Sequence, residues 1–168
     1  MIGRGAKMKI KEHFDESFLE ELDSTDHDNC VLKDPSYLNW RYSLSPSTKN
    51  HSYVKIEVTR NGVILGYAVV KKMVKKGIPM LVIADILVNK KENVADVLRQ
   101  AGYYATIKGC LVLTLLNNDI CRPAVNNIKL KAIKSNALNF LVKGKTEEET
   151  NQLTKKHFNF SFGDLDFI

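Results

Sequence analysis

One carboxylate stands out because it lies within a segment that is otherwise apolar. Asp85 is embedded in VIADILV, residues 82–88, whose length and composition predict a central strand buried on both faces. Burial raises the pKa of a carboxyl group unless the group is paired, and a raised pKa suits a general base. A structural aspartate, satisfied by backbone N–H groups or by a lysine, fits the same position. Asp85 is therefore the candidate catalytic base, and a structural role is the alternative.

A short polar turn follows this strand and leads into a helix whose N-terminus suits a phosphate group. The helix is predicted by apolar residues at helical spacing, which are Val94, Val97, Leu98, Ala101 and Ala105. Free N–H groups and the positive end of the macrodipole lie at a helix N-terminus. The turn lacks the glycines that let a backbone approach a phosphate closely. It is therefore either a phosphate-binding turn or only a scaffold.

The remaining reactive side chains form no metal-binding or nucleophilic pattern. The three cysteines and four histidines are scattered without the spacing of metal ligands. No metal site is predicted, and the thiols are expected to stay reduced, as in a cytoplasmic protein. Asp164 and Asp166 share one face of a predicted terminal strand, where solvation of a sheet edge is favoured over a metal-nucleotide site.

Size and charge restrict the class of protein. The chain has 168 residues, of which 44% are hydrophobic, and this fits one packed domain. Its net charge of +6 comes from 20 lysines and five arginines spread along the chain, which favours a solvated surface over a nucleic-acid site. An anionic small ligand, such as a nucleotide or coenzyme A, fits this charge equally well. No apolar run is long enough to span a membrane, and no membrane partner is expected.

The predicted elements alternate between helices and strands. Residues 1–11 are interpreted as an N-terminal tail or an expression scar, and residues 12–168 as a single domain. Two helices are predicted in residues 14–24 and 33–46, and Asn61-Gly62 predicts a hairpin turn between two strands. A second buried strand is predicted in CLVLTLL, residues 110–116. A helix between two buried strands predicts a right-handed crossover and a parallel pair.

The predicted order resembles the GNAT superfamily of N-acetyltransferases. KDPSYLNWRYSLSP is similar to an RD-x-x-YLxWRY…P segment of acyltransferase-like proteins found with polysaccharide-biosynthesis genes. GVILGYAVVKK, IADILV and FNFSFGDLDFI are similar to the hairpin, central strand and terminal strand of the same proteins. The resemblance implies an α/β (α+β) fold with a mixed, mostly antiparallel sheet, a central parallel pair and flanking helices. In those proteins the segment commonly forms the second of two GNAT-like halves, which implies a partner GNAT-like domain or a homodimer.

The resemblance also implies a cofactor, acetyl-CoA or another acyl-CoA, and an amine acceptor. The phosphate-binding loop of the family falls on Lys90, Asn93 and Ala95, to within one residue, and Asn93 can adopt the positive φ of the family's glycine at some cost. Val88, which ends the central strand, and Asn117, which follows the second parallel strand, are assigned to the gap that receives the acyl and pantetheine groups.

Trp40, Arg41 and Tyr42 are the candidate lining of the acceptor pocket, since arginine and aromatic side chains suit sugar or carboxylate ligands. Trp40 as a core anchor and Arg41 as a surface ion pair is the alternative. The tyrosine that often serves the family as general acid would fall near Ile128, so it is missing here.

Two functions are therefore predicted. The first is an acyl-CoA-dependent N-acyltransferase domain that acts on a small amine or an amino sugar. The second is a GNAT-like interaction or substrate-holding domain that neither catalyses nor binds acyl-CoA.

Overall fold

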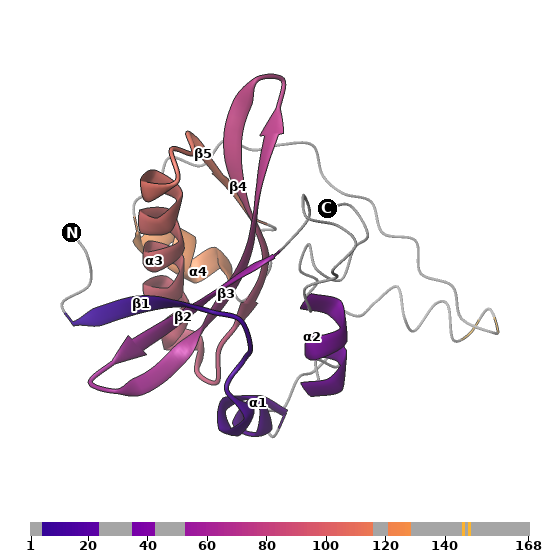
Figure 1. The fold of residues 1–168 in the computed structure, drawn as a ribbon. Helices are drawn as coiled ribbons and strands as arrows, with labels where there is room; N and C mark the ends of the chain where they lie inside the picture. The colour runs from indigo at the N-terminus through magenta and orange to yellow at the C-terminus, as the bar shows by residue number, and fades with distance from the viewer. Residues whose placement is uncertain are drawn as a thin grey trace.

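The structure, a computed structural model, describes residues 5–23, 35–42, 53–115 and 121–128, together with residues 146 and 148. The helices and strands lie in the first four of these ranges (Figure 1). In chain order they are β1 (Ala6–Lys11), α1 (Glu16–Asp23), α2 (Pro35–Tyr42), β2 (Val54–Arg60), β3 (Val63–Lys75), β4 (Ile78–Leu87), the 3₁₀ turn η1 (Lys91–Asn93), α3 (Val94–Ile107), β5 (Val112–Thr114) and α4 (Cys121–Asn127).

The five described strands form one sheet in the order β1-β2-β3-β4-β5. Neighbours are antiparallel except β4 and β5, which run parallel from the pair Met80 and Val112 to the pair Val82 and Thr114. The crossover between these two strands is α3. Asn61 and Gly62 have φ values of 52° and 82°, as the turn between β2 and β3 requires. The predicted fold class, a mixed sheet with a parallel pair and flanking helices, is confirmed.

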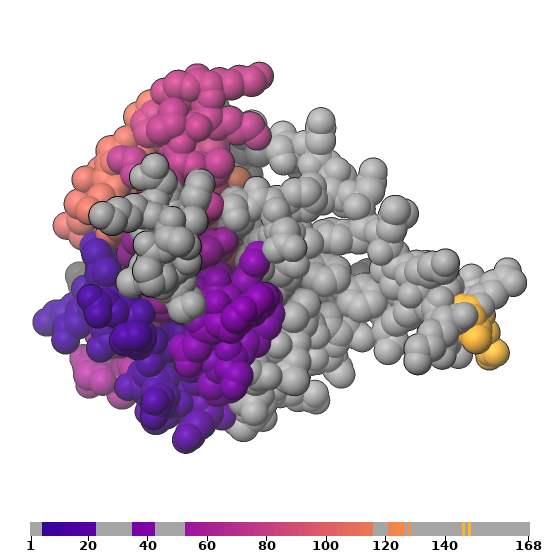
Figure 2. All heavy atoms as spheres, turned by 45° about the vertical axis from the view of Figure 1, so that its right-hand side comes forward, coloured from indigo at the N-terminus to yellow at the C-terminus, as the bar shows by residue number. Residues whose placement is uncertain are grey.

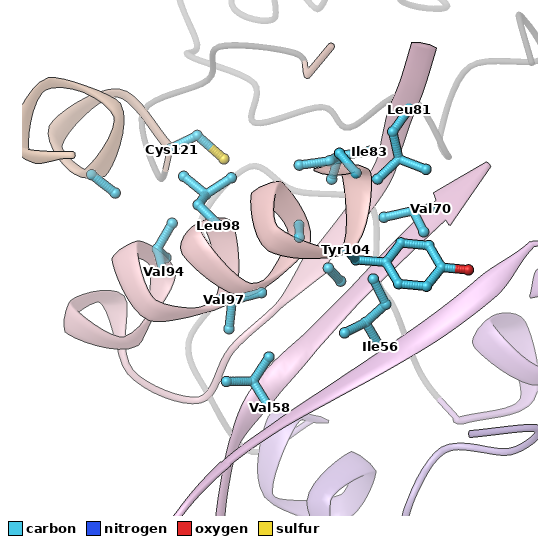
Figure 3. Close-up of a cluster of buried hydrophobic side chains, with 14 of the residues drawn as sticks. Ile56, Val58, Val70, Leu81, Ile83, Val94, Val97, Leu98, Tyr104 and Cys121 are labelled. Carbon is cyan, nitrogen blue, oxygen red and sulfur yellow. The ribbon is translucent and has the colours of Figure 1, made fainter. Parts of the chain in front are cut away.

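Helices cover both faces of the sheet. α3 and α4 lie on one face, and α1 and α2 lie on the other (Figure 1). Figure 3 shows the cluster around α3, where Val97 lies toward Val58 of β2 and Leu98 lies toward Cys121 of α4. Each such side chain contributes about 1.5–3 kcal/mol when it is fully buried. The sheet therefore has two apolar cores and no solvated face along its centre.

The helix α3 has the predicted position and the predicted buried face. All five of the residues on which its prediction rests are buried. Its end is a Schellman motif: the N–H of Gly109 donates to the carbonyl of Thr106, and that of Cys110 donates to the carbonyl of Ala105. Gly109 has the positive φ, 65°, that this motif needs. Two of the last carbonyl groups of the helix are thereby satisfied.

The interpretation of residues 1–11 as a tail is wrong for Ala6–Lys11, which form β1 and pair with β2 over their whole length. Ala6 is buried, and its carbonyl accepts a buried hydrogen bond of 3.1 Å from Nε2 of Gln100 on α3. Next to it, Arg60 at the end of β2 donates to Asp96 at 2.6 Å. The strand is held by α3, an element 90 residues later, so local composition could not reveal it.

The prediction of a long buried strand in residues 110–116 is also wrong. β5 has only three residues, and Leu111 and Val112 are 78% and 38% exposed. β5 lies at the edge of the described sheet and is not flanked on both sides. Its parallel direction is nevertheless as predicted. The sequence also predicts a strand in NALNFLVKG, residues 136–144, and a helix in TEEETNQLTKKH, residues 146–157. Apart from residues 146 and 148, these elements and the terminal strand of residues 158–168 lie outside the described residues.

A bulge in β4 sets the orientation of the second half of that strand. Val70 pairs with Ile83 and Val69 pairs with Asp85, so Ala84 is an extra residue with no partner of its own on β3. Without the bulge, Asp85 would share the face of Leu81 and Ile83, which lies under α3. With it, Asp85 shares the face of Val69, which lies under α1 and α2.

Gly66 makes a close approach between β3 and the end of β4. A Cβ atom at this position would overlap the carbonyl oxygen of Leu87 and come within 2.8 Å of Cγ1 of Val88. Gly66→Ala should therefore lower the free energy of unfolding by about 1–3 kcal/mol, which is typical of overpacking. Urea denaturation measures the change. Gly102→Ala on α3, where a Cβ atom meets nothing within 4 Å, is the control, and it should gain up to about 1 kcal/mol. Equal stability of Gly66→Ala and the natural sequence would contradict the close approach.

Candidate functional site

Asp85 lies at the point where the sheet opens. The last parallel pair joins Val82 to Thr114, whereas β4 continues to Leu87. From Ile83 onward, the edge of β4 that faces β5 has no β5 partner among the described residues. Asp85 is three residues past the last pair, within this stretch. Asp85 therefore lies just beyond the printed parallel pairing, on the side of β4 where the gap between the two strands is predicted.

The carboxylate of Asp85 is buried and already hydrogen-bonded. It is 2% exposed. Oδ2 accepts a bond of 2.9 Å from the hydroxyl of Tyr42 on α2, and Oδ1 accepts one of 2.9 Å from the backbone N–H of Ile86. These two donors fix the direction of the carboxylate. The geometry is compatible with an oriented base and equally with the structural role named as the alternative.

The three candidate acceptor residues of α2 have different environments. Tyr42 is 1% exposed and contacts Asp85, so the structure brings a predicted acceptor residue and the predicted base together. Trp40 is 71% exposed, so the alternative that it anchors the core is wrong. Its ring lies 6.0 Å from that of Tyr37. Arg41 is half-buried. Trp40 and Arg41 are therefore available at the surface of α2, and Tyr42 is an internal residue.

The turn between β4 and α3 does not have the predicted phosphate-binding conformation. Asn93 has φ −77° and ψ −16°, in the right-handed helical region, and does not adopt the positive φ of the family's glycine. Its backbone N–H donates to the carbonyl of Lys90 at 3.0 Å, and that of Val94 donates to the carbonyl of Lys91. The turn η1 uses these two N–H groups internally. A cradle centred on Asn93 therefore does not fit a pyrophosphate in this conformation.

Other groups at the same place remain suited to an anion. Lys90 and Lys91 are exposed cations, and the N–H groups of Lys91 and Glu92 precede the first hydrogen bond of the turn. The buried Asp96 in the first turn of α3 is paired with two arginines, at 2.6 Å and 3.3 Å, so little of its charge opposes an anion.

The other assigned cofactor residues are spread around the end of β4. Val88 is half-buried, packs against the α3 core and lies beside Gly66. Ala95 is half-buried at the start of α3. Asn117 lies outside the described residues. Ile128, where the family tyrosine would fall, is partly buried against the core at the end of α4.

A buried polar network beneath α1 was not predicted as part of any site. Lys55 and Glu57 are 3% and 5% exposed, on the face of β2 that lies under α1 and α2. The hydroxyl of Tyr67 donates to Oε2 of Glu57 at 2.8 Å and accepts from the backbone N–H of Asp15 at 3.1 Å. Asp15 caps α1 through the N–H of Phe18. The network therefore ties the start of α1 to the centre of the sheet.

Burial shifts the pKa values of two groups in this network. Desolvation raises the pKa of Tyr67, and its hydrogen bond to Glu57 raises that pKa further. Desolvation lowers the pKa of Lys55. Nζ of Lys55 donates to the carbonyl of Tyr42 at 2.7 Å and lies 5.3 Å above the ring of Phe14. Lys55 thus links the network to the segment that carries Tyr42 and, through it, to Asp85. The alternation of polar and apolar residues in β2 predicts a strand. It does not show that α1 and α2 cover the polar residues Lys55 and Glu57.

The described residues contain neither a metal-binding cluster nor a membrane-spanning helix. No group of three or more His, Cys, Asp and Glu side chains in the described ranges is placed to hold a metal ion. Among the same residues, no helix is long and apolar enough to cross a membrane.

Comparisons with solved structures agree on the fold. An aminoglycoside acetyltransferase from an uncultured soil metagenomic sample, in complex with trehalose, superposes with a TM-score of 0.54 and 13% sequence identity over 86% of this chain and 100% of its own. Glucosamine-6-phosphate N-acetyltransferase from Arabidopsis thaliana gives a TM-score of 0.52 and 14% identity, over 81% and 99% of the two chains. No protein-family model matches the sequence, and a search of curated protein sequences finds no match. The chain therefore has the fold of GNAT acetyltransferases, on structural likeness alone.

The burial of Lys55 should make the free energy of unfolding change with pH in the alkaline range. Because its pKa is lowered from the ordinary value of 10.5 in the folded state, the unfolded chain binds more protons than the folded chain between the lowered value and 10.5. The free energy of unfolding should therefore gain a contribution from Lys55 as pH rises through that window. Lys55→Met keeps the apolar stem and removes the titration, so its free energy of unfolding should rise less.

Urea denaturation at a series of pH values up to 10.5 compares the two proteins. Other groups that titrate in this range, such as Tyr67, are common to both and cancel in the difference. Lys9→Met, at an exposed position of β1, is the control and should follow the natural sequence. A constant difference between Lys55→Met and the natural sequence at all pH values would show that Lys55 is not desolvated in solution.

Proposed function

We propose that the chain is an acyl-CoA-dependent N-acyltransferase that acts on a small amine or an amino sugar, with Asp85 as its general base. The observation that carries this proposal is the position of Asp85, which is buried in β4 where the parallel pairing with β5 ends. The fold supports it, because two solved structures that share it are an aminoglycoside acetyltransferase and an N-acetyltransferase of glucosamine-6-phosphate. The acceptor is proposed from the amino sugars that these names contain.

The chemistry asks little of the protein beyond position and one proton transfer. Acyl-CoA would supply the thioester, and the amine must be neutral to attack it, so a base must take a proton from the ammonium form. Asp85 would accept this proton. The hydroxyl of Tyr42, at 2.9 Å, would hold the carboxylate in one direction and donate to it while it is ionised. Burial by α1 and α2 would keep water from competing at the carboxylate.

Groups on the described chain would hold the two ends of acyl-CoA. The edge of β4 from Ile83 to Val88 would offer backbone N–H and C=O groups to the pantetheine, and Asn117 is retained as a further contact. The exposed side chains of Lys90 and Lys91, with the N–H groups of Lys91 and Glu92, would contact the phosphates. The N–H groups of this phosphate site lie one and two residues before Asn93. The exposed Trp40 and the half-buried Arg41 would meet the acceptor.

A second candidate function is a GNAT-like domain without catalysis, which serves as an interaction or substrate-holding module for a partner GNAT-like domain or a second copy. Two observations favour it. The N–H groups of Asn93 and Val94 are used within the turn, and both carboxylate oxygens of Asp85 already have donors. The absence of a tyrosine at Ile128 agrees with this candidate.

Substitution of the base separates the two candidates. The natural sequence should transfer an acetyl group from acetyl-CoA to at least one member of a panel of amino sugars and small amines, as measured by release of free thiol. Asp85→Asn keeps the shape of the side chain but cannot accept the proton, so kcat should fall by about 10²–10⁴-fold. Tyr42→Phe should lower kcat less, because it only frees the direction of the carboxylate.

Thermal unfolding of each variant verifies that it is folded before its rate is compared. Full activity of a folded Asp85→Asn protein would remove Asp85 as the base. No transfer by the natural sequence to any amine of the panel would favour the second candidate.

Binding of acetyl-CoA is tested independently of turnover. A ligand at about 100 times its dissociation constant stabilises the folded state by about 2.7 kcal/mol, which a thermal shift detects. Lys90→Gln combined with Lys91→Gln should weaken the shift, whereas Lys7→Gln combined with Lys9→Gln, on β1, should leave it unchanged. The absence of a shift at saturating acetyl-CoA would exclude the acyltransferase.

A further inference from the structure

The β3–β4 hairpin ends in a tip where apolar and basic side chains are exposed together. Val74 and Ile78, on either side of the turn Lys76-Gly77, are 64% and 45% exposed. Leu111, whose N–H donates to the carbonyl of Pro79, adds an apolar side chain that is 78% exposed. We name the tip patch the group formed by these three apolar residues together with Lys72, Lys75 and Lys76. Large apolar groups gathered on a surface usually mark a contact.

Charge at the tip patch is of one sign. Residues 63–84 contain four lysines and neither aspartate nor glutamate, and residues 97–115 likewise contain no acidic residue. Lys75 and Lys76 are exposed beside the turn, and Nζ of Lys72 donates to the carbonyl of Lys108 at the end of α3 at 2.8 Å. The cations of the tip therefore have no acidic partner within these two ranges, and their field favours an anionic partner.

Both faces of the hairpin carry this mixture of side chains. The register places Val74 opposite Pro79, and Lys75 opposite Ile78. Since paired residues share a face and neighbours alternate, Val74 and Ile78 point to opposite faces of the hairpin. A groove or a flat protein surface would contact one of these faces. Only a medium that surrounds the tip contacts both.

The tip of the hairpin also projects from the surface of the molecule. It projects past the end of α3 in Figure 1 and forms the upper projection of the surface in Figure 2. A projection with apolar residues at its end can enter the headgroup region of a bilayer, where lysines bind anionic lipids. A second copy of the chain is disfavoured, because a symmetric contact would bring the lysines of two tips together.

We propose that the tip patch docks this protein on an anionic lipid bilayer, with Val74 and Ile78 inserted among the headgroups and the tip lysines bound to acidic lipids. The contact is peripheral and is made by a hairpin, so it requires no membrane-spanning helix. A bilayer is favoured over a nucleic acid because the hairpin tip contains lysines and no arginine, whereas arginine provides the fork that grips phosphates and bases in nucleic-acid readers.

Cosedimentation of the full chain with lipid vesicles tests the proposal. The chain should bind vesicles of equimolar phosphatidylcholine and phosphatidylserine and should not bind vesicles of phosphatidylcholine alone. Binding should weaken as salt is raised, since the Debye length falls from about 30 Å at 0.01 M to about 8 Å at 0.15 M ionic strength.

Paired variants locate the contact. Lys75→Gln combined with Lys76→Asn, where asparagine tolerates the φ of 52° at residue 76, should weaken binding by about fivefold for each lysine removed. Val74→Thr combined with Ile78→Thr keeps the β-branched shape and should also weaken binding. The matched controls on β1, Lys7→Gln with Lys9→Gln and, separately, the exposed Ile10→Thr, should bind as the natural sequence does.

Thermal unfolding of each variant confirms its fold before binding is compared. Equal binding by the tip variants and the natural sequence would overturn the proposal, and so would equal losses in the tip and β1 variants. Equal binding to neutral vesicles, or binding to a DNA oligonucleotide without binding to acidic vesicles, would overturn it as well.

Discussion

The geometry of the candidate site depends on one extra residue in β4. Ala84 has no partner of its own on β3, and this shifts the residues that follow it to the opposite face of the sheet. Asp85 consequently lies under α2, where Tyr42 reaches it, and not under α3, where Leu81 and Ile83 form an apolar core. A carboxylate in that core would have no polar partner and would be costly to ionise. The bulge therefore places the carboxylate where it has a hydrogen-bond donor, which allows a charged group within this buried strand.

Much of the fold could be predicted from the sequence because the central elements have strong local signals. The periodic face of α3, the Asn61-Gly62 turn and the apolar run of β4 all agree with the structure. The strand β1 could not be predicted, because it is held by β2, by the side chain of Gln100 and by packing under α3, all of which are remote in sequence. The brevity of β5 was missed for a related reason, since an apolar run does not reveal whether a strand has neighbours on both sides.

The candidate site was predictable in its residues and less so in its geometry. Asp85 stood out as a lone charge in an apolar run, yet its contact with Tyr42 depends on a bulge that no residue type announces. The resemblance allows Asn93 to replace glycine in a turn of positive φ, but the chain enters α3 through a 3₁₀ turn that any residue can adopt. The hydrogen bond between Tyr67 and Glu57 could not be predicted, because the sequence of a strand does not show which helix packs on it.

The lysines of β1 have a consequence for the behaviour of the whole chain. β1 is an outer strand of the described sheet, and Lys7, Lys9 and Lys11 are exposed along it. Charged residues on an outer strand discourage the growth of intermolecular sheets, because each incoming chain would have to confront the same charges. Trimming the first eleven residues to shorten the protein would uncover the unpaired backbone of β2 with its apolar Ile56 and Val58. Removal of residues 1–11 would therefore lead to self-association and then to precipitation.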